Sequence, residues 1–375
     1  MDNKYLDKLS VFWESTKRHL NNRLLLFSIV SVSFLLIASL YLSHSANHLL
    51  TLNNEIPSHH YLEPNNPLKY AANWDGSDYI HIAKDGYTTG FYTGFFPVYP
   101  LLIKLVNYLI PSAIISGLII SWVCLIGAVY FYGKLVLEFC KNIKKNTKNN
   151  ELLKAVAFFL LFPSGIYLLS VYTESLFALL AFAAVYYAQK RKYLVSSVLV
   201  SVACATHVRG VFVLILILLM MIEDKINFRK IIMYGMAGSL GLLGYMAYLW
   251  KYFNNPLQFL AAQKQHHWLE KGLWSNLSLM SYLDIILITL LITTVVYWWR
   301  RRKSFSVYAM LFLTIPFLGG QFGGFPRYTM MAFPMTLMIY EYLQSKEQIR
   351  QVVTILFSML WSLVTILFSV GYVFN

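Results

Sequence analysis

The residues best suited to chemistry lie in one polar stretch, 73–87, which contains three aspartates and a histidine. If 75–85 is helical, side chains three and four positions apart share a face, so Asp78, His81 and Asp85 form one polar stripe. Asp75 stands at the leading edge of that stripe. A carboxylate there can take a proton from a hydroxyl group if its surroundings raise its pKa or hold it close to that proton.

Two alternatives stay open for this stretch. Asp75, Asp78 and His81 can also bind a divalent cation, because carboxylates and imidazoles are common metal ligands. The stretch can also be a solvated amphipathic helix that rests on a membrane and carries no chemistry.

A run of aromatic residues and prolines, 94–100, follows the polar stretch and includes Phe96 and Tyr99. Aromatic side chains beside an acidic loop can form a platform for a sugar ring or a lipid head group. At a membrane interface the same residue types often serve only as anchors.

The rest of the chain is dominated by apolar runs, which predict an all-α membrane protein. Hydrophobic residues make up 58% of the 375 residues and charged residues only 13%, against about 25% charged residues in a typical soluble domain. Runs such as 24–42 and 351–374 reach the roughly 20 residues that a spanning helix needs. The three cysteines lie in or beside apolar runs, which indicates buried thiols and not a disulfide framework.

Basic residues indicate which ends of the spans face the cytoplasm. The net charge is +14, and Lys and Arg gather in short connectors as they do in cytoplasmic loops, so nucleic acid is not an expected partner. This pattern predicts a cytoplasmic N-terminal tail over 1–23 and a single domain over 24–375 with about 11 transmembrane helices.

The predicted topology has two larger outside loops, about 43–110, with amphipathic helices, and about 251–281. The segment 95–110 is interpreted as an interfacial or re-entrant piece. Counting it as a span would place the lysine cluster at 141–154 outside.

Three ionisable residues fall at predicted outer ends of spans, namely Glu174, Arg209 and Arg327. Ionisable residues in such places are rare and suggest function. Glu174 can orient an arginine or bind a sugar hydroxyl, or it can simply follow a helix start capped by Thr173. For Arg209 and Arg327 the simple alternative is snorkelling toward the interface.

Several short motifs resemble the PIG-V family of mannosyltransferases, which belongs to the GT-C superfamily of polytopic glycosyltransferases. The matching residues are Trp74-Asp75, Ile82-Ala83, Gly86-Tyr87, Phe95-Phe96-Pro97-Val98-Tyr99-Pro100, Phe162-Pro163-Ser164, Tyr172-Thr173-Glu174-Ser175-Leu176-Phe177, Thr206-His207-Val208-Arg209-Gly210, Pro326-Arg327-Tyr328 and Phe333-Pro334. Two positions depart from the family pattern. Asp78 stands where eukaryotic members carry His, and His207 displaces the arginine of the Thr-Arg-Ser-Asn-Gly segment.

The resemblance implies a GT-C-like fold and the transfer of a sugar, with mannose as the expected one. The implied donor is a polyprenyl-phosphate sugar, and the acceptor is a lipid, a glycan or a protein on the outer face. Asp75 matches the acidic candidate base of the first outside loop in that family, and the implied transfer inverts the sugar configuration. Arg209 and Arg327 would then stabilise the charge that develops on the lipid phosphate.

The expected substrate contacts follow from these motifs and from the polar stretch. They are Trp74, Asp78, His81, Phe96, Tyr99, Glu174, His207, Arg209, Arg327 and Tyr328. The segment His266-His267-Trp268 in the second outside loop is expected to cover the site or to be a solvated loop.

Two other functions remain open at this point. A transporter or flippase of lipid-linked sugar precursors would place ionisable sites near the bilayer midplane and often shows inverted repeats, whereas the acids here concentrate in the first outside loop. A non-catalytic membrane scaffold does not explain the clustered Asp, Trp and His. The expected location is a prokaryotic cell membrane, with the endoplasmic reticulum membrane as the alternative.

Overall fold

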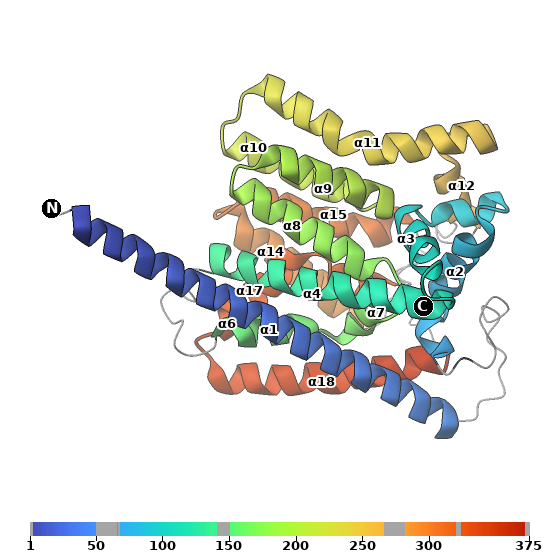
Figure 1. Ribbon diagram of the computed structural model, residues 1–375, viewed down its shortest axis with the longest axis horizontal. Helices are drawn as coiled ribbons and strands as arrows, with labels where there is room; N and C mark the ends of the chain where they lie inside the picture. Colours follow the sequence, from blue (N-terminus) through green and yellow to red (C-terminus); the bar gives the residue numbers. More distant parts are fainter. Residues whose placement is uncertain are drawn as a thin grey trace.

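The computed structural model describes residues 3–49, 66, 68–140, 151–265, 282–319 and 324–371, and within these ranges the regular structure is entirely helical. The helices of the main bundle lie roughly side by side along one direction (Figure 1). They are α1 (Asn3–Leu49), α4 (Ala113–Phe139), α6 (Glu151–Leu160), α8 (Glu174–Gln189), α9 (Tyr193–Thr206), α10 (Gly210–Glu223), α11 (Phe228–Phe253), α14 (Tyr282–Trp299), α15 (Lys303–Gly319), α17 (Phe333–Leu343) and α18 (Glu347–Ser369).

The remaining elements are short. They are η2 (Lys69–Ala72), α2 (Asp75–Asp85), η3 (Gly90–Gly94), α3 (Val98–Asn107), η5 (Pro163–Gly165), α7 (Ile166–Leu169), α12 (Gln258–Gln265) and α16 (Phe325–Thr329). Of these, α2, α3 and α12 lie together at one end of the bundle (Figure 1). The segment 95–110 therefore forms a ten-residue helix, α3, that packs on α2 and α4.

Within the described ranges, four helical stretches are long and apolar enough to cross a membrane: Asn21–Ala46 of α1, α4, α11 and α18. A fifth results if α6 and the segment Pro163–Leu169 are taken as one span bent by 73°. Helices α8, α9 and α10 have 14 to 16 residues. They reach only about 21–24 Å, less than the ~30 Å of a hydrocarbon core. The all-α membrane character is confirmed, while the count of about 11 spans and the loop topology stay predictions.

Capping residues explain where several helices begin and end. The Ser112 side chain accepts a hydrogen bond from the Ile115 amide at the start of α4, and Asn227 accepts one from Arg229 at the start of α11. At the other end of α11, Asn254 adopts a left-handed conformation with a φ of 52°, which Asn tolerates and which stops the helix.

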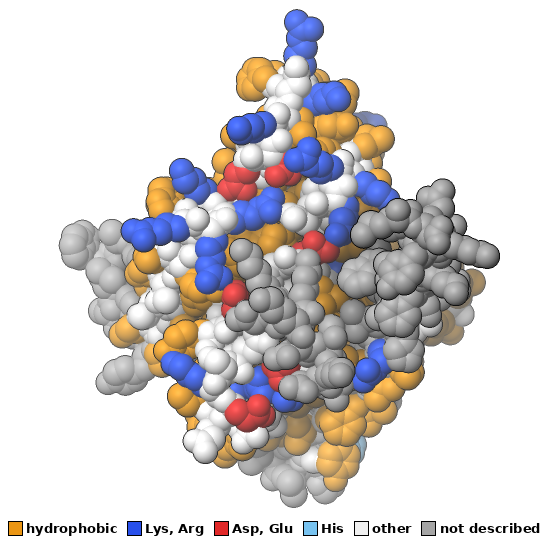
Figure 2. All heavy atoms as spheres, turned by 90° about the vertical axis from the view of Figure 1, so that its left-hand side faces the viewer, with side chains coloured by type: hydrophobic (Ala, Val, Ile, Leu, Met, Phe, Trp, Pro, Cys, Tyr) orange, Lys and Arg blue, Asp and Glu red, His pale blue; other side chains and the backbone are white. Residues whose placement is uncertain are grey.

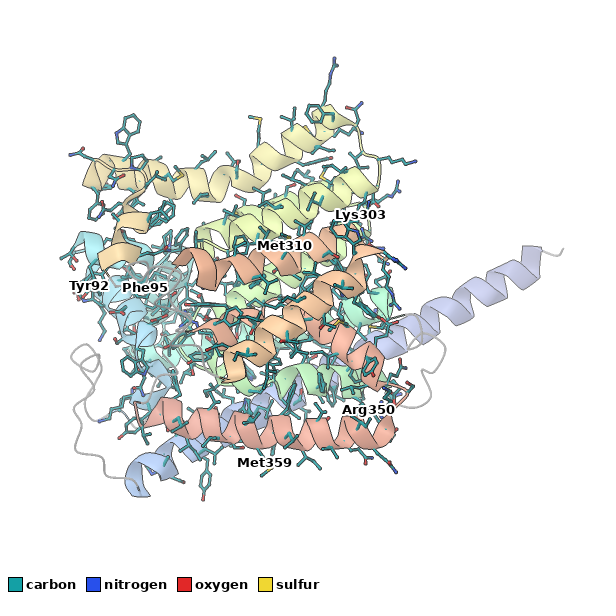
Figure 3. The ribbon with its side chains drawn as sticks, turned by 180° about the vertical axis from the view of Figure 1, so that it is seen from behind. Tyr92, Phe95, Lys303, Met310, Arg350 and Met359 are labelled. Atoms are coloured by element: carbon teal, nitrogen blue, oxygen red, sulfur yellow. The ribbon has the colours of Figure 1, made fainter. Side chains whose placement is uncertain are left out.

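The two ends of the helix bundle differ in composition. Lys303 and Arg350 lie at one end, and Tyr92 and Phe95 of the first predicted outside loop lie at the other (Figure 3). Lys and Arg side chains gather over the face seen in Figure 2, which belongs to the first of these ends. This basic end is the one that the sequence predicts to face the cytoplasm.

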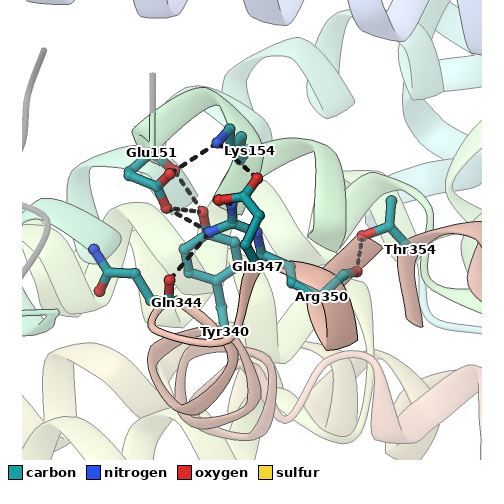
Figure 4. A network of polar contacts seen from close by, with 7 residues as sticks. All are labelled: Glu151, Lys154, Tyr340, Gln344, Glu347, Arg350 and Thr354. Carbon is teal, nitrogen blue, oxygen red and sulfur yellow. Dashed lines mark hydrogen bonds and ion pairs between the residues drawn. The ribbon is translucent and has the colours of Figure 1, made fainter. Parts of the chain in front are cut away.

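A buried ion-pair network ties three helices together at the basic end (Figure 4). Glu151 Oε2 of α6 lies 2.7 Å from Arg350 Nη1 of α18 and accepts a hydrogen bond of 2.8 Å from Tyr340 Oη of α17. Both charged side chains are buried, so each depends on the other for compensation of its charge. Lys154 and Glu347 extend the network at its rim, with contacts of 3.0 and 2.8 Å.

Replacing Arg350 by methionine tests this network. Methionine is also long but carries no charge, so the buried Glu151 carboxylate loses its guanidinium partner, a change that costs roughly 3–5 kcal/mol. We expect a clear fall in the thermal unfolding temperature of the detergent-purified protein. Adding Glu151→Gln should restore part of the loss, because the stranded charge is removed as well. The control is Arg300→Met, an exposed arginine at the same end. Equal unfolding temperatures for R350M and R300M would contradict the network's role.

Candidate active site

The turn before α2 holds the acidic helix in place. Helix α2 covers Asp75–Asp85, the range that the sequence predicts. Trp74, directly before it, has a φ of +57°, which side-chain-bearing residues rarely adopt. The buried Asn73 amide donates to the Phe368 carbonyl at 2.9 Å, and the Asn73 carbonyl accepts from Tyr172 Oη at 2.9 Å. The first turn of α2 is therefore fixed to the end of α18 and to the segment before α8.

Backbone contact brings α2 close to the segment that carries Glu174. The Val171 amide donates to the Ala71 carbonyl at 2.9 Å. A Cβ atom at Gly76 would lie only 3.2 Å from the Val171 carbonyl oxygen. A side chain at Gly76 would therefore push α2 away from the start of α8.

Arg327 of α16 joins two carboxylates from distant parts of the chain. Its Nη1 lies 2.7 Å from Asp75 Oδ2, and its Nε lies 2.8 Å from Glu174 Oε1. The first contact is a hydrogen bond, whereas the second is an ion pair without hydrogen-bond alignment. The side chains of Arg327, Glu174 and Asp75 are 10%, 3% and 19% exposed. Arg327 is therefore buried in an ion-pair group and does not snorkel toward the interface. Of the two roles considered for Glu174, contact with an arginine is the one seen, and that arginine is Arg327.

Aromatic rings surround the Arg327 guanidinium. Its Cζ lies 5.4, 5.1 and 4.7 Å from the ring centres of Tyr167, Tyr172 and Tyr328, within the range of cation–π attraction. Arg327 Nη2 also donates to Tyr328 Oη at 3.1 Å. Trp74 packs against the hydrophobic cluster that contains Tyr167 and Tyr172. These rings restrict Arg327 to the orientation in which it meets both carboxylates.

Arg209, in the turn between α9 and α10, is a second buried guanidinium, with 9% of its surface exposed. Its Cζ lies 3.0 Å from the centre of the Tyr328 ring. Among the described residues, no carboxylate forms an ion pair with Arg209, in contrast to Arg327. Snorkelling is wrong here too, because the side chain points into the protein. Glu174 acts on Arg209 electrostatically but forms no ion pair with it, so this buried guanidinium can still bind an anionic ligand.

His207 lies between Arg209 and an aromatic wall. Burial, and then the Arg209 charge, lower the pKa of His207 well below its ordinary value, so its imidazole is neutral. A neutral imidazole has one lone pair, so only one of its two contacts with Arg209, 3.1 Å at Nδ1 or 3.0 Å at Nε2, is a hydrogen bond. The ring stacks on Phe96 with 6.5 Å between centres and 9° between planes. Phe96 thus covers one side of the His207 imidazole.

Asp78 lies one helical turn after Asp75 and differs from it. Its side chain is half-buried and makes no hydrogen bond or ion pair within the described part of the chain. Burial, and then the neighbouring Asp75, raise the pKa of Asp78 to about 8. At neutral pH the Asp78 carboxyl is therefore mostly protonated and can donate a hydrogen bond, whereas Asp75 faces a guanidinium. Two carboxyls in such different environments can perform different tasks.

Two expected contact residues do not join this centre. Tyr99 is completely buried, and its hydroxyl contacts Ser121 Oγ of α4 at 2.8 Å. His81 Nδ1 lies 3.2 Å from Asp85, and its Nε2 lies 3.0 Å from Thr88 Oγ1. These contacts use the polar atoms of both side chains within the protein. His81 and Asp85 share the helix face that their spacing predicts, but their contact is made within the protein.

Three further expectations concern a metal, a cap and a loop. Within the described ranges, no three His, Cys, Asp or Glu side chains lie close enough to hold a metal ion, and this includes Asp75, Asp78 and His81. Thr173 occupies the N-cap position of α8, but its side chain makes no capping hydrogen bond. The segment 266–268 lies outside the described residues.

Sequence reasoning missed Asn73, Tyr167 and Tyr172 as parts of the site. Tyr172 belongs to a quoted motif, which could have drawn attention to it. Asn73 stands just before Trp74-Asp75, but its partner Phe368 lies 295 positions away. Spacing along the chain does not reveal such a contact.

Residues 19–249, more than half of the chain, match the family model described as mannosyltransferase (PIG-V). No curated protein and no solved structure matches the chain. The matched range contains Asp75, Glu174 and Arg209 and ends before Arg327. Asp75, Glu174 and Arg327 together form the ion-pair centre. Two of its residues thus lie inside the matched range, and Arg327 lies beyond it.

The raised pKa of Asp78 can be measured directly. In the folded protein, the infrared band of a protonated carboxyl should be present at about pH 6 and disappear as the pH rises through about 8. Asp78→Asn should remove this component, whereas Asp85→Asn, an exposed carboxyl on the same helix, should leave it unchanged. Since the folded state keeps this proton to a higher pH than the unfolded chain, the contribution of Asp78 to stability falls as the pH rises from about 4 to about 8. Ionisation of Asp78 below about pH 5 would contradict the assignment.

Proposed function

Because this chain belongs to the mannosyltransferase (PIG-V) family, we propose that it is a membrane glycosyltransferase that moves mannose from a polyprenyl-phosphate donor to a lipid or glycan acceptor. One observation carries the proposal. Arg327 pairs with Asp75 and Glu174, while the neighbouring buried Arg209 forms no ion pair with a carboxylate among the described residues. A donor of this kind carries a phosphate, which suits the Arg209 guanidinium. It also carries a sugar, whose hydroxyl groups suit the carboxyl groups.

In the proposed reaction the acceptor hydroxyl oxygen attacks the anomeric carbon of the sugar. The bond between that carbon and the phosphate oxygen breaks, and its electron pair leaves with the polyprenyl phosphate. The hydroxyl proton passes to the Asp75 carboxylate. Attack from the side opposite the phosphate inverts the configuration of the sugar. Arg327 acts as a positioning residue, because it fixes Oδ2 of Asp75. The Asp75 side chain remains 19% exposed, so a substrate can still reach it.

Arg209 is the group proposed to stabilise the leaving phosphate, whose negative charge grows as the bond breaks. A buried guanidinium interacts strongly with a phosphate because little water screens the pair. Arg327 is less suited to this role, because binding the phosphate would require it to release a carboxylate. The stacking of Tyr328 on Arg209 holds that guanidinium in place.

The sugar is proposed to contact Glu174 and Asp78. Glu174 Oε2 is buried and has no hydrogen-bond partner within the described residues, so it can accept from a sugar hydroxyl. The protonated Asp78 carboxyl can donate to one. Trp74, directly before Asp75 in the chain, is proposed to offer an apolar surface to the sugar ring.

The site lies at the end of the bundle opposite the basic end, since it includes the loop that carries Tyr92 and Phe95 (Figure 3). We therefore propose that transfer occurs on the outer face of the membrane. The lysine-rich composition favours a prokaryotic cell membrane, with lipid-borne substrates arriving from the bilayer.

The base assignment is tested by Asp75→Asn. The amide keeps an oxygen that can accept from Arg327 but cannot take a proton from the acceptor, so transfer should fall by roughly 10²- to 10⁴-fold while folding is preserved. The assay incubates purified protein with labelled polyprenyl-phosphate mannose and candidate lipid, glycan and protein acceptors. Asp85→Asn serves as the matched control and should keep the wild-type rate. Full activity of D75N would refute Asp75 as the base, and no transfer by the wild type to any acceptor would favour a transporter.

A further inference from the structure

A cavity of about 360 Å³ lies at the basic end of the bundle, between the turn that joins α10 to α11 and the turn that joins α14 to α15. Figure 2 shows this end, where a few acidic side chains lie among the basic ones. The cavity is lined by the four basic residues 300–303, by Trp299 before them, and by the carboxylates of Glu223 and Asp224. The net charge of the lining is therefore +2.

Both carboxylates of the cavity are engaged by the protein itself. Glu223 accepts hydrogen bonds of 2.7 and 2.8 Å from the amide and the hydroxyl of Ser304, at the start of α15. Asp224 accepts one of 2.7 Å from Tyr193 Oη, at the start of α9. Arg302 Nε lies 3.2 Å from Glu223 Oε2. These contacts hold the two turns together, and they use Arg302 to compensate charge within the protein.

Two of the other basic residues are left for a ligand. Arg301 is not one of them, because its Nη1 lies 3.2 Å from Glu341 Oε2 of α17. Arg300 and Lys303 are exposed, and neither side chain forms an ion pair or hydrogen bond with the described part of the chain. Two such cations beside one cavity can bind an anion that accepts hydrogen bonds from both, such as a phosphate.

The cavity lies at the level where helices of this protein enter the membrane. Helix α11 is one of the helices long and apolar enough to cross a membrane, and it begins at Phe228, four residues after Asp224. Phe228 is 73% exposed and Trp299 is 52% exposed. Tryptophan is enriched at the level of lipid head groups. A phosphate in the cavity therefore lies beside head groups, which favours a lipid phosphate over a free one.

We propose that this cavity binds the head group of an anionic phospholipid, with its phosphate between Arg300 and Lys303. The acyl chains extend into the bilayer along the exposed apolar side chains of α11 and α14, such as Ile232 and Val296. The lipid comes from the leaflet that the sequence predicts to be cytoplasmic. This site is separate from the ion-pair centre and does not depend on the reaction proposed there.

Native mass spectrometry of the detergent-purified protein tests the site by titration with phosphatidylglycerol and phosphatidylcholine. We expect the first phosphatidylglycerol to bind at least about tenfold more tightly than phosphatidylcholine. Arg300→Ala combined with Lys303→Ala should lower this preference at least about fivefold, because both free cations of the cavity are removed. The matched control, Arg229→Ala with Lys230→Ala, removes the same charge from exposed residues at the start of α11 that do not line the cavity. It should keep the preference.

Two results of this titration would overturn the proposal. One is equal binding of the two lipids by the wild-type protein. The other is an equal loss of preference in the two double variants, which would indicate diffuse attraction to the basic end and no defined site. Both variants change only exposed side chains, so folding should be preserved in each.

Photolabelling locates the lipid and distinguishes it from a soluble anion. Phosphatidylglycerol with a diazirine beside its glycerol backbone, in nanodiscs of phosphatidylcholine, should label peptides from the α10–α11 and α14–α15 turns. R300A/K303A should lose most of this label. Excess inorganic phosphate should leave it unchanged, because the acyl chains anchor the lipid in the bilayer. Loss of the label to inorganic phosphate would assign the cavity to a soluble anion and overturn the proposal, as would labelling confined to other helices.

Discussion

The Arg327 guanidinium lies between Asp75 and Glu174, and the rest of the site can be understood from this buried contact. A carboxylate taken out of water is unfavourable unless a positive group meets it. The first turn of α2, the start of α8 and the short helix α16 can therefore pack together only with the three charges in register. Because Arg327 is occupied in this way, the nearby Arg209 remains as the buried cation that can receive a phosphate.

The same principle operates at the other end of the bundle. Arg350 and Glu151 join α18 and α6 with a buried ion pair at the basic end, while the carbonyl of Phe368 at the far end of α18 accepts from Asn73. Helix α18 thus links the two polar regions across the apolar interior. Between them the contacts are mostly apolar, with large aromatic side chains such as Tyr132 and Phe159 stacked at 4.4 Å between ring centres. Directional polar contacts at the ends set the register that apolar packing alone would leave loose.

Much of this arrangement could be predicted from local patterns. The helix over 75–85 that the sequence analysis considered is present as α2, and the all-α membrane class followed from the apolar runs. The outer-end positions of Glu174, Arg209 and Arg327 suggested that they belong to one site. Which carboxylate meets which arginine could not be predicted, because those pairs depend on contacts between residues far apart in the chain. Asp75 and Arg327, for example, are 252 positions apart.

The failures have the same origin. His81 lies on the helix face that its spacing predicts, yet its contacts with Asp85 and Thr88 are local, and spacing does not show that these contacts take up its ring nitrogens. Tyr99 belongs to a motif that resembles a functional one, but its hydroxyl serves the packing of α3 on α4. The count of about 11 spans is not among the failures and stays a prediction, because helices of 14 to 16 residues lie near the length at which hydropathy alone identifies a span. For the two side chains, contacts in the folded protein decide a role that the local sequence leaves open. For the short helices, the length lies near the minimum for a membrane span.

The most direct measurement for this account is a cryo-EM map of the protein in a lipid nanodisc with bound polyprenyl phosphate. We expect the phosphate within hydrogen-bond distance of the Arg209 guanidinium, with Arg327 still between Asp75 and Glu174. A phosphate that displaces one of those carboxylates from Arg327, or that binds at the basic end of the bundle, would contradict it.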